Sequence, residues 1–317
     1  MNQLLSVVRE LSREVSQVYW TLLKIMVPTL IIVKLLQTLG AIKWLAMILS
    51  PVMQFVGLPD AMGLVWAAAL LTNIYTGMAV YFELAQQNPL SIAQVSVLGL
   101  LLLLGHNLVI EGTIAKKSGV RWPVTLAIRV GGALVLSAIL NLVYSTFDLY
   151  QAPAEMLWAP DRQDDSLMAW GIAQVELLLM ILVVIATLMA FLRLLRFVGI
   201  EAIMHRLLDP LLRMMGIGKQ AANTTVIGIT LGLAFGGGLL IREAQSGQLS
   251  KKDILLSMCF LGLCHSLIED TLLVMLLGAH WSAIFWGRLV FAVVVITLMA
   301  RWLRKPSGAR FLSWSMQ

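Results

Sequence analysis

The sequence predicts an all-α polytopic membrane protein made of two inverted-topology repeats. Each repeat is expected to hold three transmembrane helices plus an interfacial helix and a re-entrant hairpin. Three observations carry this prediction. The mean hydropathy is +0.87, and 13% of the residues are charged, against roughly a quarter in soluble proteins. Long apolar runs recur along the chain, and the sequence resembles itself when it is shifted by 159 residues.

Apolar runs predict the membrane spans, because a spanning helix needs about 20 mostly apolar residues. The runs of sufficient length are Val18–Leu39, Ala93–Ala115, Pro123–Phe147, Ala169–Leu192, Ile254–Leu277 and Ser282–Ala300. The net charge of +6 does not indicate nucleic-acid binding, because the basic residues flank these runs and act there as topology signals. The lipid bilayer is therefore the expected partner.

Cys259 and Cys264 lie five residues apart on one predicted helix, too far for a disulfide, so we expect reduced thiols.

The internal repeat divides the chain. The shift of 159 residues superposes rare residue types, for example Pro51 on Pro210, His106 on His265 and Trp122 on Trp281. The predicted organisation is an amphipathic N-terminal helix (1–15), repeat 1 (16–148), an acidic external linker (149–168), repeat 2 (169–307) and a cytoplasmic tail (308–317).

Two interrupted apolar stretches occupy matching positions in the halves. Met62–Phe82 and Asn223–Ile241 hold small and polar residues at their centres, and broken backbone at membrane depth is tolerated only where protein or water covers it. Paired interrupted segments of this kind indicate a transporter binding site. The alternative is a pair of ordinary membrane helices with glycine packing faces. The stretches that precede them, Ala41–Val56 and Glu201–Met215, are interpreted as interfacial helices.

The distribution of Lys and Arg favours re-entrant hairpins. If both interrupted stretches return to the side from which they entered, every basic region lies on one side of the membrane. The segments 40–92 and 148–168, which hold one basic residue each, then lie on the other side. This arrangement has six spans, with both termini in the cytoplasm, and we expect the protein in a bacterial inner (cytoplasmic) membrane.

A histidine and a following carboxylate recur in the stretches Gly105–Glu111 and Cys264–Asp270. On a continuous helix, residues four apart share a face, as would His265 with Glu269. A charge at the bilayer centre costs at least about 2.5–3.5 kcal/mol, so such a group needs a partner, a proton or water. Arg129 and Arg288 are expected either to neutralise these carboxylates or to hold an anionic substrate. The candidate substrate- or ion-binding residues are His106, Asn107, Glu111, His265, Ser266, Glu269, Asp270, Asn73, Thr76, Arg129 and Arg288.

Several motifs resemble the nucleoside-recognition, or Gate, domain family. These are Pro51 and Gly57 in a Pro-x5-Gly-[Leu/Ile] pattern, a small-residue hairpin, Leu90-Ser91, and His-x-Leu-x-x-Glu at 106–111, with copies in the second half, where the last motif ends in Asp270. The resemblance covers 16–148 and 175–307. The family includes the spore-maturation A/B proteins, the gate halves of the ferrous-iron permease B and part of the concentrative nucleoside transporters. The resemblance implies a membrane fold of the transporter type.

The expected function is that of a secondary transporter or permease that moves a small molecule or an ion by alternating access. Coupling to H⁺ or Na⁺ is expected, and no other cofactor; a homo-oligomer is compatible with the sequence. Two alternatives are a divalent-metal permease with His, Glu and Asp ligands, and a non-transporting membrane scaffold. The adjacent residues Cys264 and His265 are of types that bind metals, but no spacing matches a closed zinc site. An enzyme is not expected, because no nucleophile–base pair or phosphate loop is found.

Overall fold

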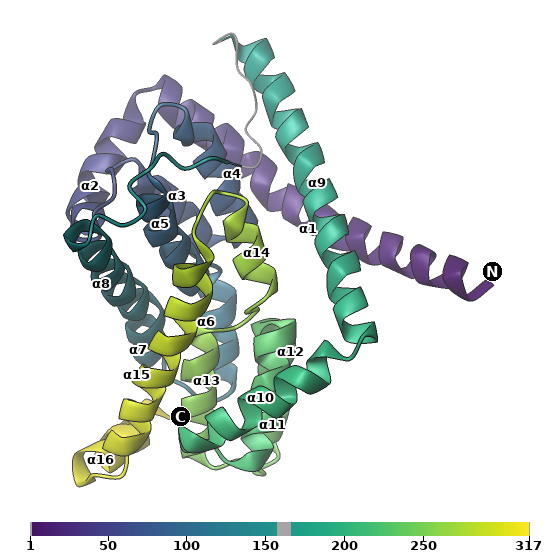
Figure 1. Ribbon diagram of the computed structural model, residues 1–317, viewed down its shortest axis with the longest axis vertical. Coiled ribbons are helices and arrows are strands. Elements are labelled where there is room, and N and C mark those ends of the chain that lie inside the picture. Colours follow the sequence, from purple (N-terminus) through teal and green to yellow (C-terminus); the bar gives the residue numbers. More distant parts are fainter. Residues whose placement is uncertain (1, 157–165, 317) are drawn as a thin grey trace.

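The computed structural model describes residues 2–156 and 166–316, and within these ranges the regular elements are helices, with no strand (Figure 1). The fold is that of an all-α polytopic membrane protein, as predicted. Five helical segments of the described ranges are long and apolar enough to cross a membrane: Arg9–Thr38, Ile92–Lys117, Trp122–Thr146, Leu167–Leu195 and Ser282–Trp302. The predicted linker falls partly outside the described residues.

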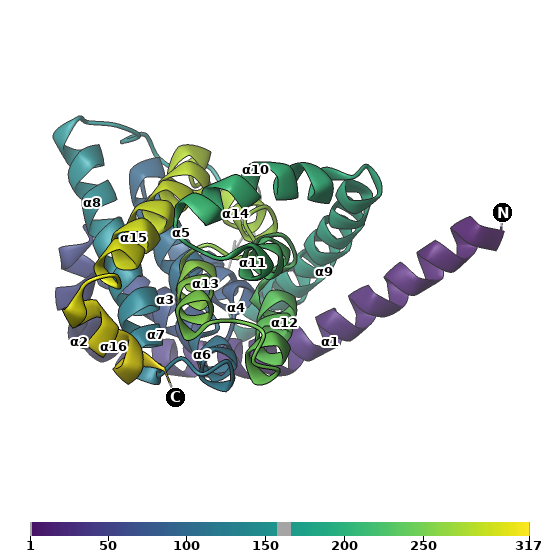
Figure 2. The same ribbon diagram turned by 90° about the horizontal axis from the view of Figure 1, so that it is seen from below.

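The two longest helices lie at the edge of the molecule. α1 (Asn2–Thr38) and α9 (Leu167–Phe197) pair along part of their length, and the Tyr19 hydroxyl donates to the Leu178 carbonyl at 3.0 Å. The first residues of α1 project away from the bundle (Figure 2). The helix predicted for residues 1–15 is therefore not a separate element, because α1 continues through it without a break.

Each half next contributes one helix and then a hairpin of two short helices. In the first half these are α2 (Ala41–Phe55), α3 (Met62–Leu71) and α4 (Ile74–Ala85). In the second half they are α10 (Ile200–Met214), α11 (Lys219–Leu231) and α12 (Leu233–Gln245). The hairpin helices have 10, 12, 13 and 13 residues, so each is shorter than the about 20 residues of a spanning helix.

Small residues let the two helices of each hairpin approach closely. A Cβ added at Gly77 would meet Ala69 at 2.6 Å, and one added at Gly236 would meet the backbone of Gly228. These two contacts are equivalent under the shift of 159 residues. The glycines of these stretches thus serve helix–helix packing within each hairpin.

The stretches that carry His106 and His265 are broken helices. α5 (Ile92–Gly105) ends before His106 and α6 (Leu108–Lys117) begins after Asn107. α13 (Lys251–Leu263) and α14 (Glu269–Met275) are separated by residues 264–268. The prediction of a continuous helix through each histidine is therefore wrong, and the run Ile254–Leu277 does not form one long span.

Each half ends in a long helix that contains a π-helical turn near its start. These elements are α7 (Trp122–Leu126), η1 (Ala127–Gly131) and α8 (Gly132–Thr146), then η2 (Ser282–Gly287), α15 (Arg288–Trp302) and the terminal α16 (Pro306–Ser315). α8 and α15 expose apolar side chains such as Leu142, Val290 and Leu298, as lipid-facing helices do. α5 is the opposite case: its leucines 98 and 100–104 are fully buried in the centre.

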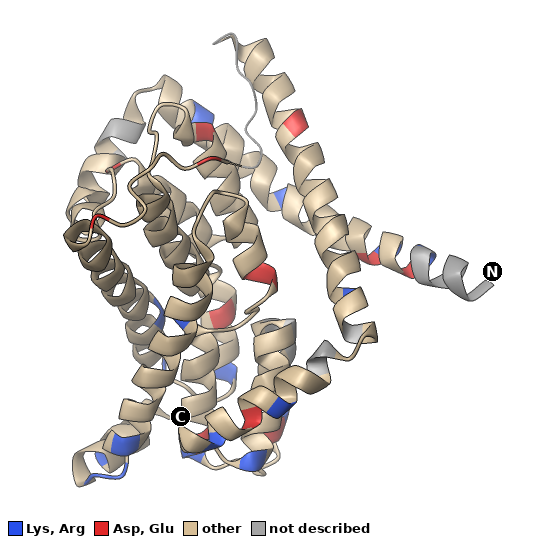
Figure 3. Cartoon of the chain, viewed as in Figure 1, with Lys and Arg blue, Asp and Glu red and all other residues tan. Residues whose placement is uncertain are grey.

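The broken helices of the two halves run antiparallel. His280, which follows α14, donates its backbone N–H to the Ser96 hydroxyl near the start of α5 at 2.8 Å. His106, just after α5, meets His265, just after α13. The far end of α14 thus lies at the beginning of α5. In Figure 3 many Lys and Arg residues gather at the end of the bundle that holds α16 and the start of α13.

Candidate functional site

The two helix breaks create the site. Asn107 and Ser266, which are equivalent residues, both adopt a left-handed backbone conformation, with φ of 55° and 44°. A helix break inside a membrane frees backbone groups that need new partners. The Asn107 N–H donates to the Ala69 carbonyl at 2.9 Å, and the Leu267 N–H donates to the Ile229 carbonyl at 2.9 Å. The first helix of each hairpin therefore holds the break of its own half in place.

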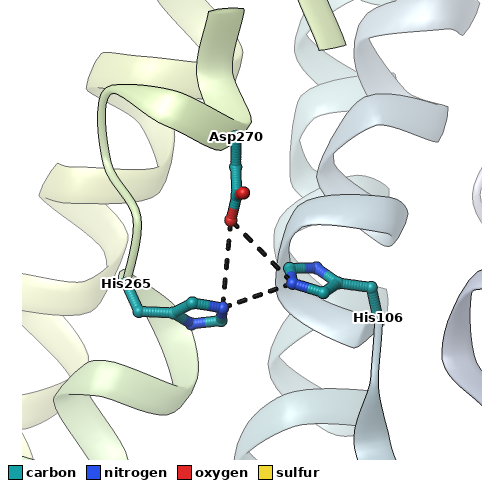
Figure 4. A group of neighbouring side chains, drawn as sticks. All are labelled: His106, His265 and Asp270. Atoms are coloured by element: carbon teal, nitrogen blue, oxygen red, sulfur yellow. Dashed lines mark hydrogen bonds and ion pairs between the residues drawn. The ribbon is translucent and has the colours of Figure 1, made fainter. Parts of the chain in front are cut away.

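The histidines of the two breaks face each other. The Nδ1 atom of His106 lies 2.9 Å from the Leu102 carbonyl, and that of His265 lies 2.8 Å from the Leu261 carbonyl. A carbonyl oxygen only accepts, so each Nδ1 carries the proton and each Nε2 presents its lone pair when the ring is neutral. The two Nε2 atoms are 3.3 Å apart (Figure 4).

One carboxylate from each half completes the cluster. Glu111 Oε1 lies 3.3 Å from His265 Nε2 and 3.6 Å from His106 Nε2. Asp270 Oδ2 lies 3.8 Å from His265 Nε2 and 3.9 Å from His106 Nε2. All four side chains are buried, with 3 to 8% of each exposed. We call His106, His265, Glu111 and Asp270 the histidine–carboxylate cluster.

The two arginines behave differently although they are equivalent. Arg129 forms a buried ion pair with Glu111 Oε2, and it also donates to the His106 carbonyl at 2.6 Å. Arg288 donates to Thr271 Oγ1 at 3.3 Å and to the Leu267 carbonyl at 3.4 Å. Its Nε and Nη1 atoms have no hydrogen-bond partner within the described residues. Of the two roles predicted for the arginines, neutralisation of a carboxylate thus describes Arg129.

The hairpin residues lie at the tip of their hairpin. Asn73 caps α4, and its Oδ1 accepts from the Thr76 N–H at 2.9 Å and from the Thr76 hydroxyl at 3.2 Å. The buried Nδ2 atom of Asn73 has no partner in the part of the chain that the structure describes. Asn73 and Thr76 hold the hairpin tip together and lie outside the cluster of four.

Glu269 and Ser266 also lie outside the cluster. The prediction that Glu269 shares a helix face with His265 is wrong, because α14 begins at Glu269 and His265 precedes it in the break. Asp270 approaches the imidazoles instead. The Ser266 hydroxyl lies against Gly232 in the second hairpin, where a Cβ would meet it at 2.9 Å.

Glu269 lines a cavity of about 420 Å³ between α1 and α9. Tyr75 and Thr230, one from each hairpin, also line this cavity, together with Glu14 and Arg193. We call it the α1–α9 cavity. Sequence reasoning missed Tyr75 and Thr230, although both are polar residues at the hairpin interruptions that it singled out. It also missed Thr271, whose hydroxyl accepts from Arg288.

The fold and the buried ionisable cluster define a polytopic α-helical membrane protein with a polar centre. The chain is 32% identical over 298 residues to an uncharacterized membrane protein, YvoD, of Bacillus subtilis (strain 168), and the match covers 92% of this chain and 94% of that protein. It therefore belongs to the same family of membrane proteins as YvoD. Neither a model of a known protein family nor a solved structure matches the chain.

Proposed function

We propose that the protein is a membrane transporter of the Gate type, which moves a small solute by alternating access. The histidine–carboxylate cluster carries this proposal. Two carboxylates, two imidazoles and two arginines are buried together where the halves meet. Ionisable groups at membrane depth are expensive and mark substrate or ion pathways by default. The resemblance of the sequence motifs to the Gate family also supports the proposal.

The arrangement of the elements supports an inverted repeat. Broken helices that run antiparallel, with their breaks adjacent, are the geometry that inverted-topology transporters use for a binding site near the midplane. The short hairpins fit re-entrant segments whose tips cover the breaks. In this arrangement six membrane passes, two of them broken helices, place both termini in the cytoplasm of a bacterium, with the protein in its inner membrane.

The α1–α9 cavity is the proposed entrance for the solute. It reaches from Glu14 and Arg193 on the outer helices to Tyr75 and Thr230 at the hairpins. Glu269 lies at its wall, and the next residue, Asp270, belongs to the histidine–carboxylate cluster. One adjacent pair of residues thus links the cavity to the cluster. Movement of one half against the other would close this route and open one on the opposite side.

The test is solute flux in proteoliposomes. A thermal-shift screen with nucleosides, amino acids, organic anions and metal ions selects the solute, and its uptake is then measured with and without a proton or sodium gradient. We expect uptake by the unmodified protein and a loss of at least tenfold in Glu111→Gln and in Glu269→Gln. Glu176→Gln, an exposed position on α9, is the control. Unchanged flux in both variants would remove these carboxylates from the mechanism, and no flux for any solute class would contradict transport.

A further inference from the structure

The histidine–carboxylate cluster has the composition of a transition-metal site. Neutral imidazole suits zinc, copper, iron and nickel, and a carboxylate adds a hard oxygen ligand. The Nε2 atoms of His106 and His265 and a carboxylate oxygen of Asp270 all lie within 4.8 Å of one another. The three residues come from both halves and are buried. Their donor atoms converge on one point from opposite sides (Figure 4).

The distances fit a four-coordinate ion. Zinc binds imidazole nitrogen and carboxylate oxygen at about 2.0–2.2 Å, so tetrahedral geometry places neighbouring donor atoms about 3.3–3.6 Å apart. The two Nε2 atoms are separated by 3.3 Å, and Glu111 Oε1 lies 3.3 and 3.6 Å from them. These three donor atoms therefore already form one face of such a tetrahedron. Asp270 Oδ2 lies slightly beyond this range from the same two Nε2 atoms, at 3.8 and 3.9 Å.

The surroundings orient the donors as a metal site requires. A ligating histidine usually donates its other ring N–H to a carbonyl or carboxylate, and ligating carboxylates are themselves hydrogen-bonded. Both Nδ1 atoms lie within hydrogen-bond distance of backbone carbonyls, which directs both Nε2 lone pairs into the gap. Arg129 binds Oε2 of Glu111 and so leaves Oε1 for the ion.

The cluster is rich in groups that attract a cation. Two nitrogen lone pairs and two carboxylates face one another in a space that excludes most water, and Asp270 Oδ2 has no hydrogen-bond partner within the described residues. A cation placed between these groups satisfies all of them. Arg129 and Arg288, both buried, add positive charge nearby and weaken the hold on a dication. We therefore expect a site that exchanges its ion, unlike a closed structural zinc site.

We propose that His106, His265 and Glu111, with Asp270 as fourth ligand, bind one divalent transition-metal ion between the two halves. The mixed nitrogen and oxygen donors favour Zn²⁺, Fe²⁺, Co²⁺ or Mn²⁺ over Ca²⁺ and Mg²⁺, which take oxygen ligands. The binding site stands on its own geometry. This ion is also the transported solute, a step that rests on the proposed transport function.

Cobalt titration of the purified full-length protein tests the site. The protein is stripped with a chelator and titrated with Co²⁺, whose visible absorption is far more intense in four-coordinate than in six-coordinate sites. We expect one Co²⁺ per chain, strong visible bands and displacement by Zn²⁺. His106→Gln and His265→Gln are expected to weaken Co²⁺ binding at least tenfold, and His205→Gln, outside the cluster, is the matched control. Absence of stoichiometric Co²⁺ binding, or equal binding by all three variants, would overturn the site.

X-ray absorption on the zinc-loaded unmodified protein needs no variant, so it decides the question even if the variants fold poorly. The expected zinc shell holds two imidazole nitrogens and carboxylate oxygen. Sulfur in that shell would overturn the assignment in favour of Cys264, which neighbours His265. Uptake of radioactive zinc into proteoliposomes then distinguishes metal binding from metal transport. Binding without zinc uptake would keep the site and reject zinc as cargo, whereas flux of another solute without metal binding would reject the site and keep transport.

Discussion

The Nε2 atoms of His106 and His265, which are 159 residues apart in the chain, lie 3.3 Å from each other. Each ring is fixed by a backbone carbonyl four residues before it. Each also lies in a helix break that is held by a hairpin of its own half. The contact between the two halves therefore depends on the backbone at both breaks, and substitutions there test the account.

Loss of Arg129 should destabilise the protein strongly. Arg129→Met leaves Glu111 buried without its ion-pair partner, and breaking a buried pair from one side costs about 3–5 kcal/mol. Arg288→Met should cost less, because Nε and Nη1 of Arg288 have no hydrogen-bond partner in the described part of the chain. The measurement is thermal unfolding in detergent. Equal losses in the two variants would argue against the asymmetry between the halves.

The double substitution Arg129→Met with Glu111→Gln should recover part of the stability lost in Arg129→Met alone, because the unpaired buried charge is gone. A double variant no more stable than the single one would show that Arg129 contributes mainly by packing.

A methyl group at Gly236 should push the second hairpin apart. Its Cβ would meet the backbone of Gly228 in α11, which cannot move aside as a flexible side chain can, so we expect a loss of about 1–3 kcal/mol from overpacking. Gly238→Ala, two residues further along α12, meets nothing within 4 Å and should be neutral or stabilising by up to about 1 kcal/mol. Thermal unfolding of the two variants side by side is the measurement, and similar behaviour of both would contradict the close hairpin crossing.

Backbone conformation at the first break can be tested at Asn107. Its φ of 55° is tolerated by Asn and Gly but costs other residues about 1–2 kcal/mol. Asn107→Gly should therefore keep both stability and solute uptake, while Asn107→Val should reduce both. A stable, active Asn107→Val variant would indicate that the helix runs unbroken through this position.

Thiol labelling can show whether the α1–α9 cavity admits water. Thr230→Cys lines the cavity and should react with a small polar thiol reagent, with loss of uptake. Thr225→Cys, five residues earlier on α11 and fully buried, should not react. The native Cys259 and Cys264 are buried and should contribute little background. Equal labelling at positions 225 and 230 would be inconsistent with a cavity that ends at the hairpins.

Much of the fold could be predicted from the sequence, because a shift of 159 residues places the same residue types at the same turns. Gly57 and Gly216, for example, are equivalent and both adopt positive φ. The helix breaks were not predicted, because neither break contains Pro and the second, at residues 264–268, contains no Gly. At the first break the local signals were Gly105, the last residue of α5, and Asn107, which tolerates the left-handed conformation, whereas Ser266 offers none. The breaks exist because tertiary contacts from the hairpins satisfy the freed backbone.

The composition of the site was predicted, but its pairing was not. The histidines, Glu111, Asp270 and the arginines were all candidates, and the structure brings them together. Helical spacing paired His265 with Glu269, whereas the break rotates Asp270 into that place. Arg129 and Arg288 have different partners because the side chain of Asp270 is one methylene shorter than that of Glu111. Glu111 reaches Arg129 and the imidazoles at once, while the shorter Asp270 approaches the imidazoles, and Arg288 hydrogen-bonds Thr271 and the Leu267 carbonyl instead.

The opposite insertion of the two halves is tested most directly by accessibility labelling of Gln87→Cys and Ser246→Cys in intact cells. These positions are equivalent under the shift of 159 residues, follow α4 and α12 respectively, and are both exposed. The account predicts that a membrane-impermeant thiol reagent labels position 87 from outside the cell, and position 246 only after the cells are opened. Labelling of both positions from the same side would contradict it.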